Sequence, residues 1–284
     1  MTTTGAPLDQ SALRARLLAP EGRYAALDVV ERTGSTNTDL SFAANHGAAD
    51  RTVLIAEEQT AGQGRLIRHW ISPPGGGIYC SVLLRPEDLP PIRLSWLTLL
   101  AGVALVRTAR WAGAAEAGLK WPNDLLLGPD QRKAAGVLAE VSNQDSGDRK
   151  GNAVVLGMGL NVLPLGEEVP LGAGGLAATS LAEAGATQLD RTEILTHLLT
   201  ELATLDDAWR AADGNPFASG LHEEYRQYCV TFGRRVRVEL GGASDDIEGV
   251  ASYLEGDGTL VVRMPDGTDH SVSAGDVVHL RTQD

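Results

Sequence analysis

The sequence predicts an α+β fold, in which a mixed sheet with helices precedes a small β barrel. Segments with helical spacing and with strand spacing are mixed between residues 27 and 229, but they do not alternate strictly as in a parallel α/β sheet. From residue 232, short strands recur every eight to ten residues between Gly- and Asp-containing turns. With 284 residues, 43% of them hydrophobic, the chain can form one large core and a second small one. We therefore expect a tail at 1–22, a main domain at 23–230 and a β domain at 231–284.

The first elements follow from caps and periodicity. A short helix is expected at 11–18, and it ends before Pro20 because proline cannot continue a helix. A strand is expected at 27–32, after which Ser35 and Thr36 offer N-caps to a helix that runs to residue 46.

Residues 58–77, after a strand expected at 53–58, are rich in Gly, Arg and Pro and show no periodicity. Loops of this length are uncommon in a compact domain and are usually functional or disordered. The remaining elements of the main domain are a strand at 78–85, a buried helix at 92–111, a hairpin of strands at 133–141 and 153–162, a Gly-rich stretch at 165–175, and helices at 191–212 and 216–229.

The formal net charge of −13 and the pI of about 4.9 create a field that repels phosphate backbones. Nucleic-acid binding is therefore not expected. One cationic island stands out, because Arg65, Arg68 and His69 have no carboxylate near them between residues 60 and 85.

The sequence favours a cytoplasmic protein. No apolar run approaches the roughly 20 residues of a membrane-spanning helix, and the N-terminus lacks the features of a secretory signal. Cys80 and Cys229 are the only cysteines and lie far apart in sequence, so we expect buried thiols rather than a disulfide framework or a cysteine zinc site.

Residues 60–70, TAGQGRLIRHW, combine glycines with planar, multi-donor cations. Gly62 and Gly64 allow close backbone approach, while Arg65 and Arg68 can bind oxyanions. This composition suits the attack of a carboxylate on the α-phosphate of ATP, where charge grows on phosphorus and on the leaving pyrophosphate. The alternative is a solvated turn with two surface arginines.

The segment KWPND places Lys120 and Asp124 around a Pro-Asn turn, so the lysine could face a phosphate and the aspartate could hold Mg²⁺ or orient ATP. A plain turn between two strands is the alternative. Lys133 opens an apolar strand, where it could bind a carboxylate or could simply be solvated.

Taken together, these segments resemble the biotin protein ligases from about residue 27 to the end of the chain. The motifs that carry the resemblance, in order, are GSTN (34–37), EQTAGQGRLIRHWISPPGGGIY (58–79), LKWPNDLLL (119–127), KAAGVLAEV (133–141), VVLGMGLNV (154–162) and GDVVHLR (275–281). The resemblance implies a class II synthetase-like catalytic domain that binds biotin and ATP, followed by an SH3-like barrel.

The resemblance also implies roles for individual residues. Biotin would be bound by Ser35, Thr36, Asn37, Gln59, Gln63, Gly64, Arg65 and Lys133. ATP and the adenylate would be bound by Arg65, Arg68, Trp70, Lys120, Asn123 and Asn161. Catalysis would depend on Lys133, Arg65 and Arg68, and Asp124 would hold Mg²⁺.

The reaction implied is that of the biotin–[biotin carboxyl-carrier protein] ligases. Biotin and MgATP would give biotinyl-5'-adenylate, and a lysine of the carrier domain of an acyl-CoA or pyruvate carboxylase would then accept the biotin. With only about 26 residues before the catalytic region, no DNA-binding domain and no repressor activity are expected. We expect a monomer that binds neither DNA nor a membrane.

Two positions depart from the family pattern Gly-Arg-Gly-Arg-x-Gly-Arg. Gln63 replaces the first arginine, and Ile67 replaces the third glycine, so a charge and a flexible position are lost. Losing a charged hydrogen bond costs roughly 1.5–3 kcal/mol. Our hypothesis is slower adenylation or looser retention of the intermediate, and unchanged rates in Gln63→Arg would rule it out.

Two other functions stay open at this point. A lipoate-type ligase or acyltransferase shares the catalytic fold in related families, although Gln59 with the Ser-Thr-Asn turn favours biotin. A non-catalytic protein could also use the altered loop to bind an adenylate or a nucleic acid without turnover.

Overall fold

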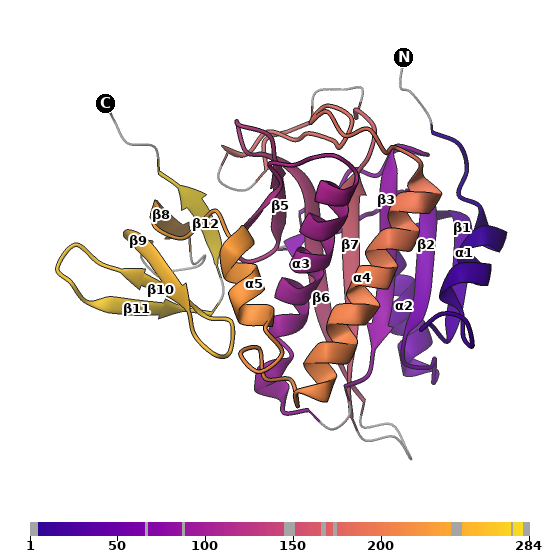
Figure 1. Cartoon of the computed structure of the whole chain (residues 1–284), viewed down its shortest axis with the longest axis horizontal. Coiled ribbons are helices and arrows are strands. Elements are labelled where there is room, and N and C mark those ends of the chain that lie inside the picture. The colour runs from indigo at the N-terminus through magenta and orange to yellow at the C-terminus, as the bar shows by residue number, and fades with distance from the viewer. Residues whose placement is uncertain are drawn as a thin grey trace.

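The main domain of the computed structural model is built on a seven-stranded mixed sheet, as predicted (Figure 1). The structure describes residues 5–65, 68–86, 89–144, 151–165, 169–172, 175–239, 246–273 and 275–280. The sheet order is β1-β2-β3-β7-β6-β5-β4. Its strands are β1 (Ala26–Thr33), β2 (Thr52–Gln59), β3 (Gly77–Leu84), β4 (Gly118–Lys120), β5 (Asp124–Leu127), β6 (Arg132–Gln144) and β7 (Gly151–Asn161).

Only β1 and β2 pair in parallel, and every other ladder of this sheet is antiparallel. The predicted hairpin of β6 and β7 is confirmed, with Ala135 opposite Leu160 and Gly136 opposite Gly159. Because strand side chains alternate between the two faces, this register sends Gly136, Gly157 and Gly159 to one face.

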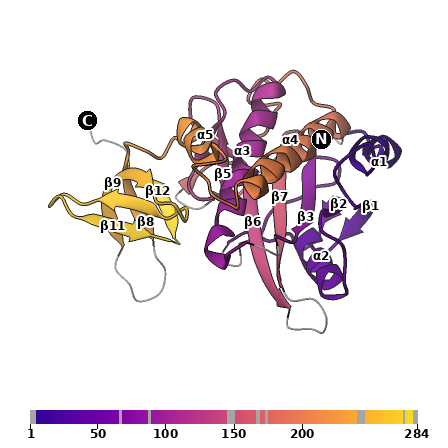
Figure 2. The ribbon, with the colours of Figure 1, turned by 60° about the horizontal axis from the view of Figure 1, so that its bottom comes forward.

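Helices cover both faces of the sheet (Figure 2). On one face lie α3 (Trp96–Trp111) and α4 (Arg191–Ala211), with α1 (Gln10–Leu17) and α5 (Leu221–Tyr228) beside them, whereas α2 (Thr36–Asn45) packs on the opposite face. A short 3₁₀ helix, η2 (Pro91–Arg93), precedes α3.

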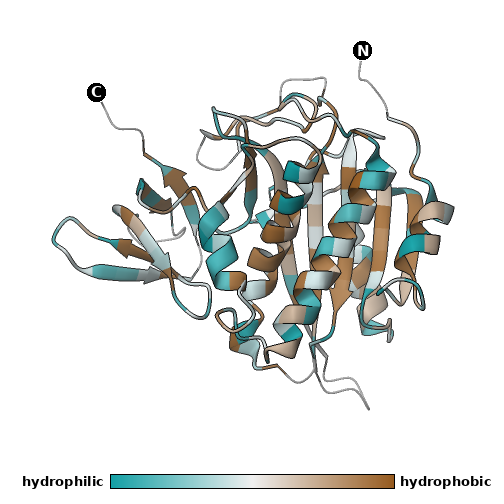
Figure 3. Ribbon diagram, viewed as in Figure 1, coloured by the Kyte–Doolittle hydropathy of each residue, from teal (hydrophilic) through white to brown (hydrophobic). Residues whose placement is uncertain are grey.

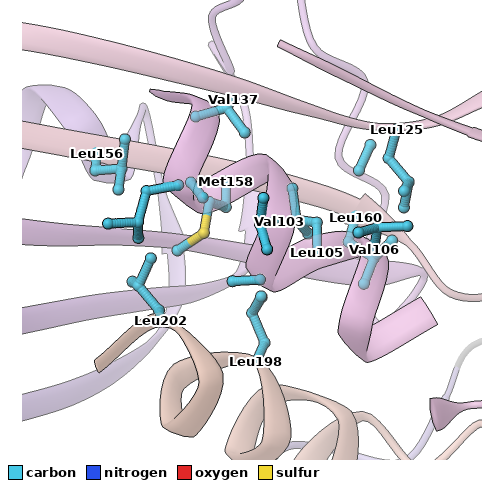
Figure 4. Packing of buried hydrophobic residues seen from close by; sticks show 14 of the residues in the cluster. Val103, Leu105, Val106, Leu125, Val137, Leu156, Met158, Leu160, Leu198 and Leu202 are labelled. Carbon is cyan, nitrogen blue, oxygen red and sulfur yellow. The ribbon is translucent and has the colours of Figure 1, made fainter. Parts of the chain in front are cut away.

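The core lies between α3, α4 and the sheet. Side chains of α3, including Val103 and Val106, meet Leu198 and Leu202 of α4 and apolar residues of the strands (Figure 4). The strands that they cover are largely apolar, whereas α4 and α5 carry hydrophilic residues as well (Figure 3). Leucine, valine and methionine side chains that pack in this way leave water almost completely, which supplies the main driving force for folding.

The length of one apolar helix differs from the expectation from sequence. In the described part of the chain, the segment Pro91–Trp111, of 21 residues, is long and apolar enough to cross a membrane, contrary to the expectation from sequence. Of its apolar window, 72% is buried inside the domain, as expected of a core helix.

The segment expected to be a tail is packed into the main domain from residue 5 onward. The predicted helix is present as α1, and Leu13 and Leu17 on it are buried in the core. Arg16 forms an ion pair with Glu193 of α4 at 2.6 Å. A short helix gains stability when an apolar stripe finds a partner, which the sequence of α1 alone does not reveal.

The C-terminal domain is an antiparallel sheet with the order β11-β10-β9-β8-β12. Its strands are β8 (Arg235–Glu239), β9 (Ile247–Leu254), β10 (Leu260–Arg263), β11 (Asp269–Val272) and β12 (Asp276–His279). Within the described residues this sheet is not closed, since β11 and β12 each have one neighbour. The predicted barrel is therefore not confirmed.

Two indole N–H groups attach the turn between β9 and β10 to the main domain. Trp96 donates to the carbonyl oxygen of Gly256 at 2.9 Å, and Trp121 donates to that of Gly258 at 3.1 Å. Both rings are almost fully buried. This attachment joins the C-terminal domain to the start of α3 and to the turn between β4 and β5.

Candidate active site

A cavity of about 400 Å³ opens on the face of the sheet that carries α2. Its walls come from the start of α2, the loop after β2, strands β5 to β7 and the start of β12. Every residue predicted for the site lines it: Ser35, Thr36, Asn37, Gln59, Gln63, Gly64, Arg65, Arg68, Trp70, Lys120, Asn123, Asp124, Lys133 and Asn161. Among these predicted residues, Ser35 and Asn161 lie 126 residues apart in sequence and still meet in one site.

Ser35 ends the turn after β1 and is the N-cap residue of α2, as predicted. Its backbone is extended, but its hydroxyl does not cap the helix, and the residue is 5% exposed. A buried hydroxyl without a capping bond is available to a ligand, and it stands at the positive end of the helix dipole.

Gln59 connects the end of β2 to the start of α2. Its Oε1 accepts hydrogen bonds from the backbone N–H of Thr36 at 2.9 Å and from the Thr36 hydroxyl at 3.0 Å, and its Nε2 donates to the Ser72 hydroxyl at 3.2 Å. One N–H of the Gln59 amide is left over, so this side chain can still donate to a ligand carbonyl.

The side chain of Asn37 forms most of its hydrogen bonds with other groups of the protein. Its Nδ2 donates to the carbonyl oxygen of Leu138 at 3.3 Å and to Glu140 at 2.7 Å, and its Oδ1 accepts from Ser81 at 2.6 Å. Both N–H groups are used, so a ligand can reach only the remaining acceptor capacity of Oδ1. Toward a ligand, Asn37 can therefore act only as an acceptor in this arrangement.

Glycines form the floor of the cavity. An added Cβ at Gly157 would lie 2.2 Å from Asn37 Oδ1, and one at Gly159 would lie 2.5 Å from the ring of Trp70. Such distances are impossible for real atoms, so the two glycines make room for Asn37 at one end and for Trp70 at the other. Alternating glycines in the strand motif GMG were a sequence signal for this floor.

Three charged side chains meet beside Trp70. Asp124 Oδ1 lies 2.6 Å from Lys133 Nζ, Asp124 Oδ2 lies 3.7 Å from Lys120 Nζ, and Lys133 Nζ lies 5.7 Å from the centroid of the Trp70 ring. KWPND is indeed a turn between two strands, with Lys120 opposite Asp124 in the ladder. Burial lowers the pKa of Lys120, and the negative charge of Asp124 opposes that shift.

The two arginines of the loop reach the C-terminal domain. Arg65 donates to Asn123 Oδ1 at 3.3 Å and to the carbonyl oxygen of Gly275 at 3.2 Å, while Arg68 forms an ion pair with Asp276. Burial lowers the pKa of Arg65, although an arginine stays protonated at neutral pH. Asp276 lines the cavity and was missed from sequence, because nothing local marks a partner 208 residues away.

Two polar groups on the cavity wall are available to a ligand. The amide oxygen of Asn161 and the indole N–H of Trp70 are buried without a hydrogen-bond partner in the part of the chain that the structure describes. Asn161 Nδ2 donates to the carbonyl oxygen of Thr179 at 2.9 Å, which holds its oxygen in place. Unpaired buried polar groups are costly, so each favours a ligand that offers a complementary atom.

The residues do not fit a resident Mg²⁺ ion. Asp124, the predicted ligand, pairs with two ammonium groups, and the described residues contain no group of three His, Cys, Asp or Glu side chains that could hold a metal. Mg²⁺ prefers several oxygen ligands in near-octahedral geometry. Ile67, the second departure noted in the loop, lies outside the described residues.

Comparison with known proteins agrees with this geometry. Residues 29–161 match the biotin/lipoate A/B protein ligase family, and residues 231–280 match the biotin protein ligase C-terminal domain. The biotin--[acetyl-CoA-carboxylase] ligase of Mycobacterium tuberculosis is 43% identical over 279 residues, which is 97% of each chain. The bifunctional ligase/repressor BirA of Escherichia coli is 30% identical over 86% of this chain and 70% of that protein.

Among solved structures, the biotin protein ligase from Aquifex aeolicus in complex with biotin and ATP has a TM-score of 0.71 and 25% identity to this chain. The match covers 91% of this chain and all of the other. The similarity in sequence thus extends through both domains, and the similarity in fold covers nearly the whole chain. The chain belongs to the biotin protein ligase family.

Proposed function

We propose that this protein forms biotinyl-5'-adenylate from biotin and ATP and transfers the biotin to a lysine of a biotin carboxyl carrier domain. The observation that carries the proposal is the division of one cavity into two chemically different ends. Hydroxyl and amide groups around Ser35 and Gln59 occupy one end, and the cations around Asp124 occupy the other. The volume of about 400 Å³ lies in the range of small-molecule sites.

The neutral end takes the ureido head of biotin. A ureido group has one carbonyl, which needs donors, and two N–H groups, which need acceptors. The free hydroxyl of Ser35, the remaining N–H of Gln59 and the acceptor capacity of Asn37 and Thr36 supply both kinds. The bicyclic ring of biotin then lies next to Trp70, whose ring covers Gly159 of the glycine floor.

The cationic end takes the biotin carboxylate and the phosphates. A carboxylate oxygen attacks the α-phosphorus, a new P–O bond forms, and the bond to pyrophosphate breaks with its electron pair leaving on pyrophosphate. Lys133 and Arg65 neutralise the two anions as they approach, which lowers the barrier by positioning and charge. Arg68, Lys120, Asn123 and Asn161 bind the nucleotide part.

In the second step, the neutral amine of the acceptor lysine attacks the carbonyl carbon of the mixed anhydride. A C–N bond forms, the C–O bond to phosphate breaks, AMP leaves and the amine loses a proton. The acceptor is a carboxylase carrier domain, in keeping with the name of the mycobacterial relative. We also assign an SH3-like form to the C-terminal domain, and a monomeric, cytoplasmic state to the protein.

ATP–pyrophosphate exchange with biotin, with lipoate and with no acid tests the first step, in the wild type and in Lys133→Ala. We expect exchange with biotin alone, and a loss of about a hundredfold or more in the variant, since a charge that meets the reacting anions is worth about 3 kcal/mol or more. Exchange with lipoate alone would assign the protein to the lipoate ligases, and no exchange with either acid would contradict adenylation.

A further inference from the structure

Ser81 is a fully buried polar residue beside the cavity that the sequence motifs do not include. It lies on β3 and is 0% exposed. Its hydroxyl lies 2.8 Å from the hydroxyl oxygen of Thr36 and 2.6 Å from Asn37 Oδ1. One side chain on the central part of the sheet therefore touches two consecutive residues at the start of α2.

The contacts of Ser81 connect two separate branches of hydrogen bonds. Through Thr36 the first branch continues to Gln59 and Ser72. Through Asn37 the second branch continues to Leu138 and Glu140 on β6. A ligand at this end of the cavity therefore meets side chains whose orientations depend on one another.

A serine hydroxyl has one proton, so it can donate to only one of its two neighbours. Asn37 Oδ1 can only accept, and it lies at the shorter distance of 2.6 Å from the Ser81 oxygen. It therefore accepts the hydrogen bond from Ser81. The Thr36 hydroxyl donates to Gln59 Oε1, so toward Ser81 and toward a ligand it offers only its lone pairs. The Ser81 proton therefore fixes the orientation of the Asn37 amide oxygen, an acceptor on the cavity wall.

The packing around Ser81 supports a dedicated role. Ser81 stands opposite Gly157 in the ladder between β3 and β7, and Gly157 leaves the space that Asn37 fills. The Asn37 amide thus lies against the backbone of β7 at Gly157, with Ser81 beside it. Only this orientation of the amide satisfies Leu138, Glu140 and Ser81 together.

We infer that Ser81 is a positioning residue that sets the donor and acceptor pattern of the ureido-binding end, and so contributes to selection of biotin. The inference rests on the proposed function. Without the Ser81 hydroxyl, Asn37 loses the hydrogen bond that orients its amide oxygen, and the Thr36 hydroxyl loses a neighbour that holds it in place. A ligand N–H would then meet acceptors whose orientations are no longer fixed.

Ser81→Ala tests this role by removing only the hydroxyl. We expect the Kd for biotin, measured by calorimetry, to rise about tenfold, as loss of one buried hydrogen bond predicts. The KM for ATP in pyrophosphate exchange should stay within about twofold of the wild type, because the two branches end at the neutral end of the cavity. Ser81→Cys, which keeps a weak donor of similar shape, should give an intermediate Kd.

Ser180→Ala is the matched control. Ser180 is also 0% exposed, and its hydroxyl bonds to Glu183 rather than to a cavity residue. A comparable loss of thermal stability in both alanine variants, with weaker biotin binding only in Ser81→Ala, would support the inference. An unchanged Kd for biotin in Ser81→Ala, or an equal rise in the KM for ATP, would overturn it. If the wild type itself did not bind biotin, the proposed function would fail first.

Discussion

Lys120, Lys133 and Asp124 illustrate the electrostatics of the site at the scale of single residues. Two ammonium groups share one carboxylate, and Lys120 and Asp124 are 3% and 5% exposed. Buried charges are costly unless they are fully compensated, so this end of the cavity has a deficit of negative charge. An anionic ligand would supply that charge.

His279 leads to a prediction about pH. Burial is the largest cause that lowers the pKa of His279, to about 4, and the positive charges of Lys120 and Arg234 add to it. The ordinary value is about 6.5, so between pH 4 and 6.5 the unfolded chain binds more protons at this position than the folded one. Stability from this residue therefore rises with pH through that window and is lost as the pH falls.

The prediction can be checked with urea unfolding at pH 7 and pH 5. We expect the free energy of unfolding to fall less between the two pH values in His279→Gln than in the wild type, because glutamine cannot take up the proton and can keep a hydrogen bond to Thr231. Equal losses in the two proteins would show that His279 does not contribute.

At the scale of elements, β7 matters because it carries both a core face and a substrate face. Leu156, Met158 and Leu160 point into the core against α3 and α4, while Gly157 and Gly159 point to the cavity (Figure 4). The period of two in a strand makes this division possible. One strand therefore contributes side chains to the core and leaves space on its other face for Trp70 in the loop after β2.

Gly159→Ala should disturb the site strongly. The added Cβ would lie 2.5 Å from the ring of Trp70, so the ring and the loop that carries it must move. Overpacking of this kind costs about 1–3 kcal/mol, and we expect the Kd for biotin to rise roughly tenfold to hundredfold. Calorimetric titration of biotin measures this.

Gly136→Ala provides the control for that variant. It faces the same ring from the neighbouring strand, but its added Cβ would lie at an ordinary contact distance of 3.4 Å from Trp70. Biotin affinity should change by less than about threefold. Similar losses in both variants would mean that the distance between the floor and Trp70 does not control binding.

At the scale of the whole molecule, the two domains meet at the cavity. The C-terminal domain is attached through the turn between β9 and β10, and it supplies Gly275 and Asp276 to the arginines of the loop. The domain lies beside the main sheet rather than over its helical layer (Figure 1). Nucleotide binding should therefore depend on both domains.

Asp276→Asn should affect ATP more than biotin. The change removes the charge that pairs with Arg68, which is partly exposed, so we expect the KM for ATP to rise about fivefold, or about 1 kcal/mol. The Kd for biotin should change less than twofold, because the residues that we propose bind the ureido group lie at the other end of the cavity. Steady-state pyrophosphate exchange and calorimetry separate the two quantities.

Asp269→Asn removes a comparable ion pair, Arg263–Asp269, within the outer hairpin of the same domain. It should leave both constants unchanged. If it changed the KM for ATP as much as Asp276→Asn did, the effect would arise from the stability of the domain and not from its contact with the loop.

The sequence by itself determined most of the secondary structure and, except for Asp276, the charged members of the site. Hydrophobic periods of 2 and 3.6 are local, so they predicted the hairpin of β6 and β7 and the helices α2, α3 and α4, and the ordered motifs identified the residues that line one cavity. Only the tertiary structure decided how those residues are used. Partners distant in sequence decide three of these features: the hydrogen bond of Asn37 to Glu140, the ion pair of Arg68 with Asp276, and the burial of α1 and Ser81. Hydrogen bonds and packing act through space, and no local pattern records which distant group will take a donor or fill a gap.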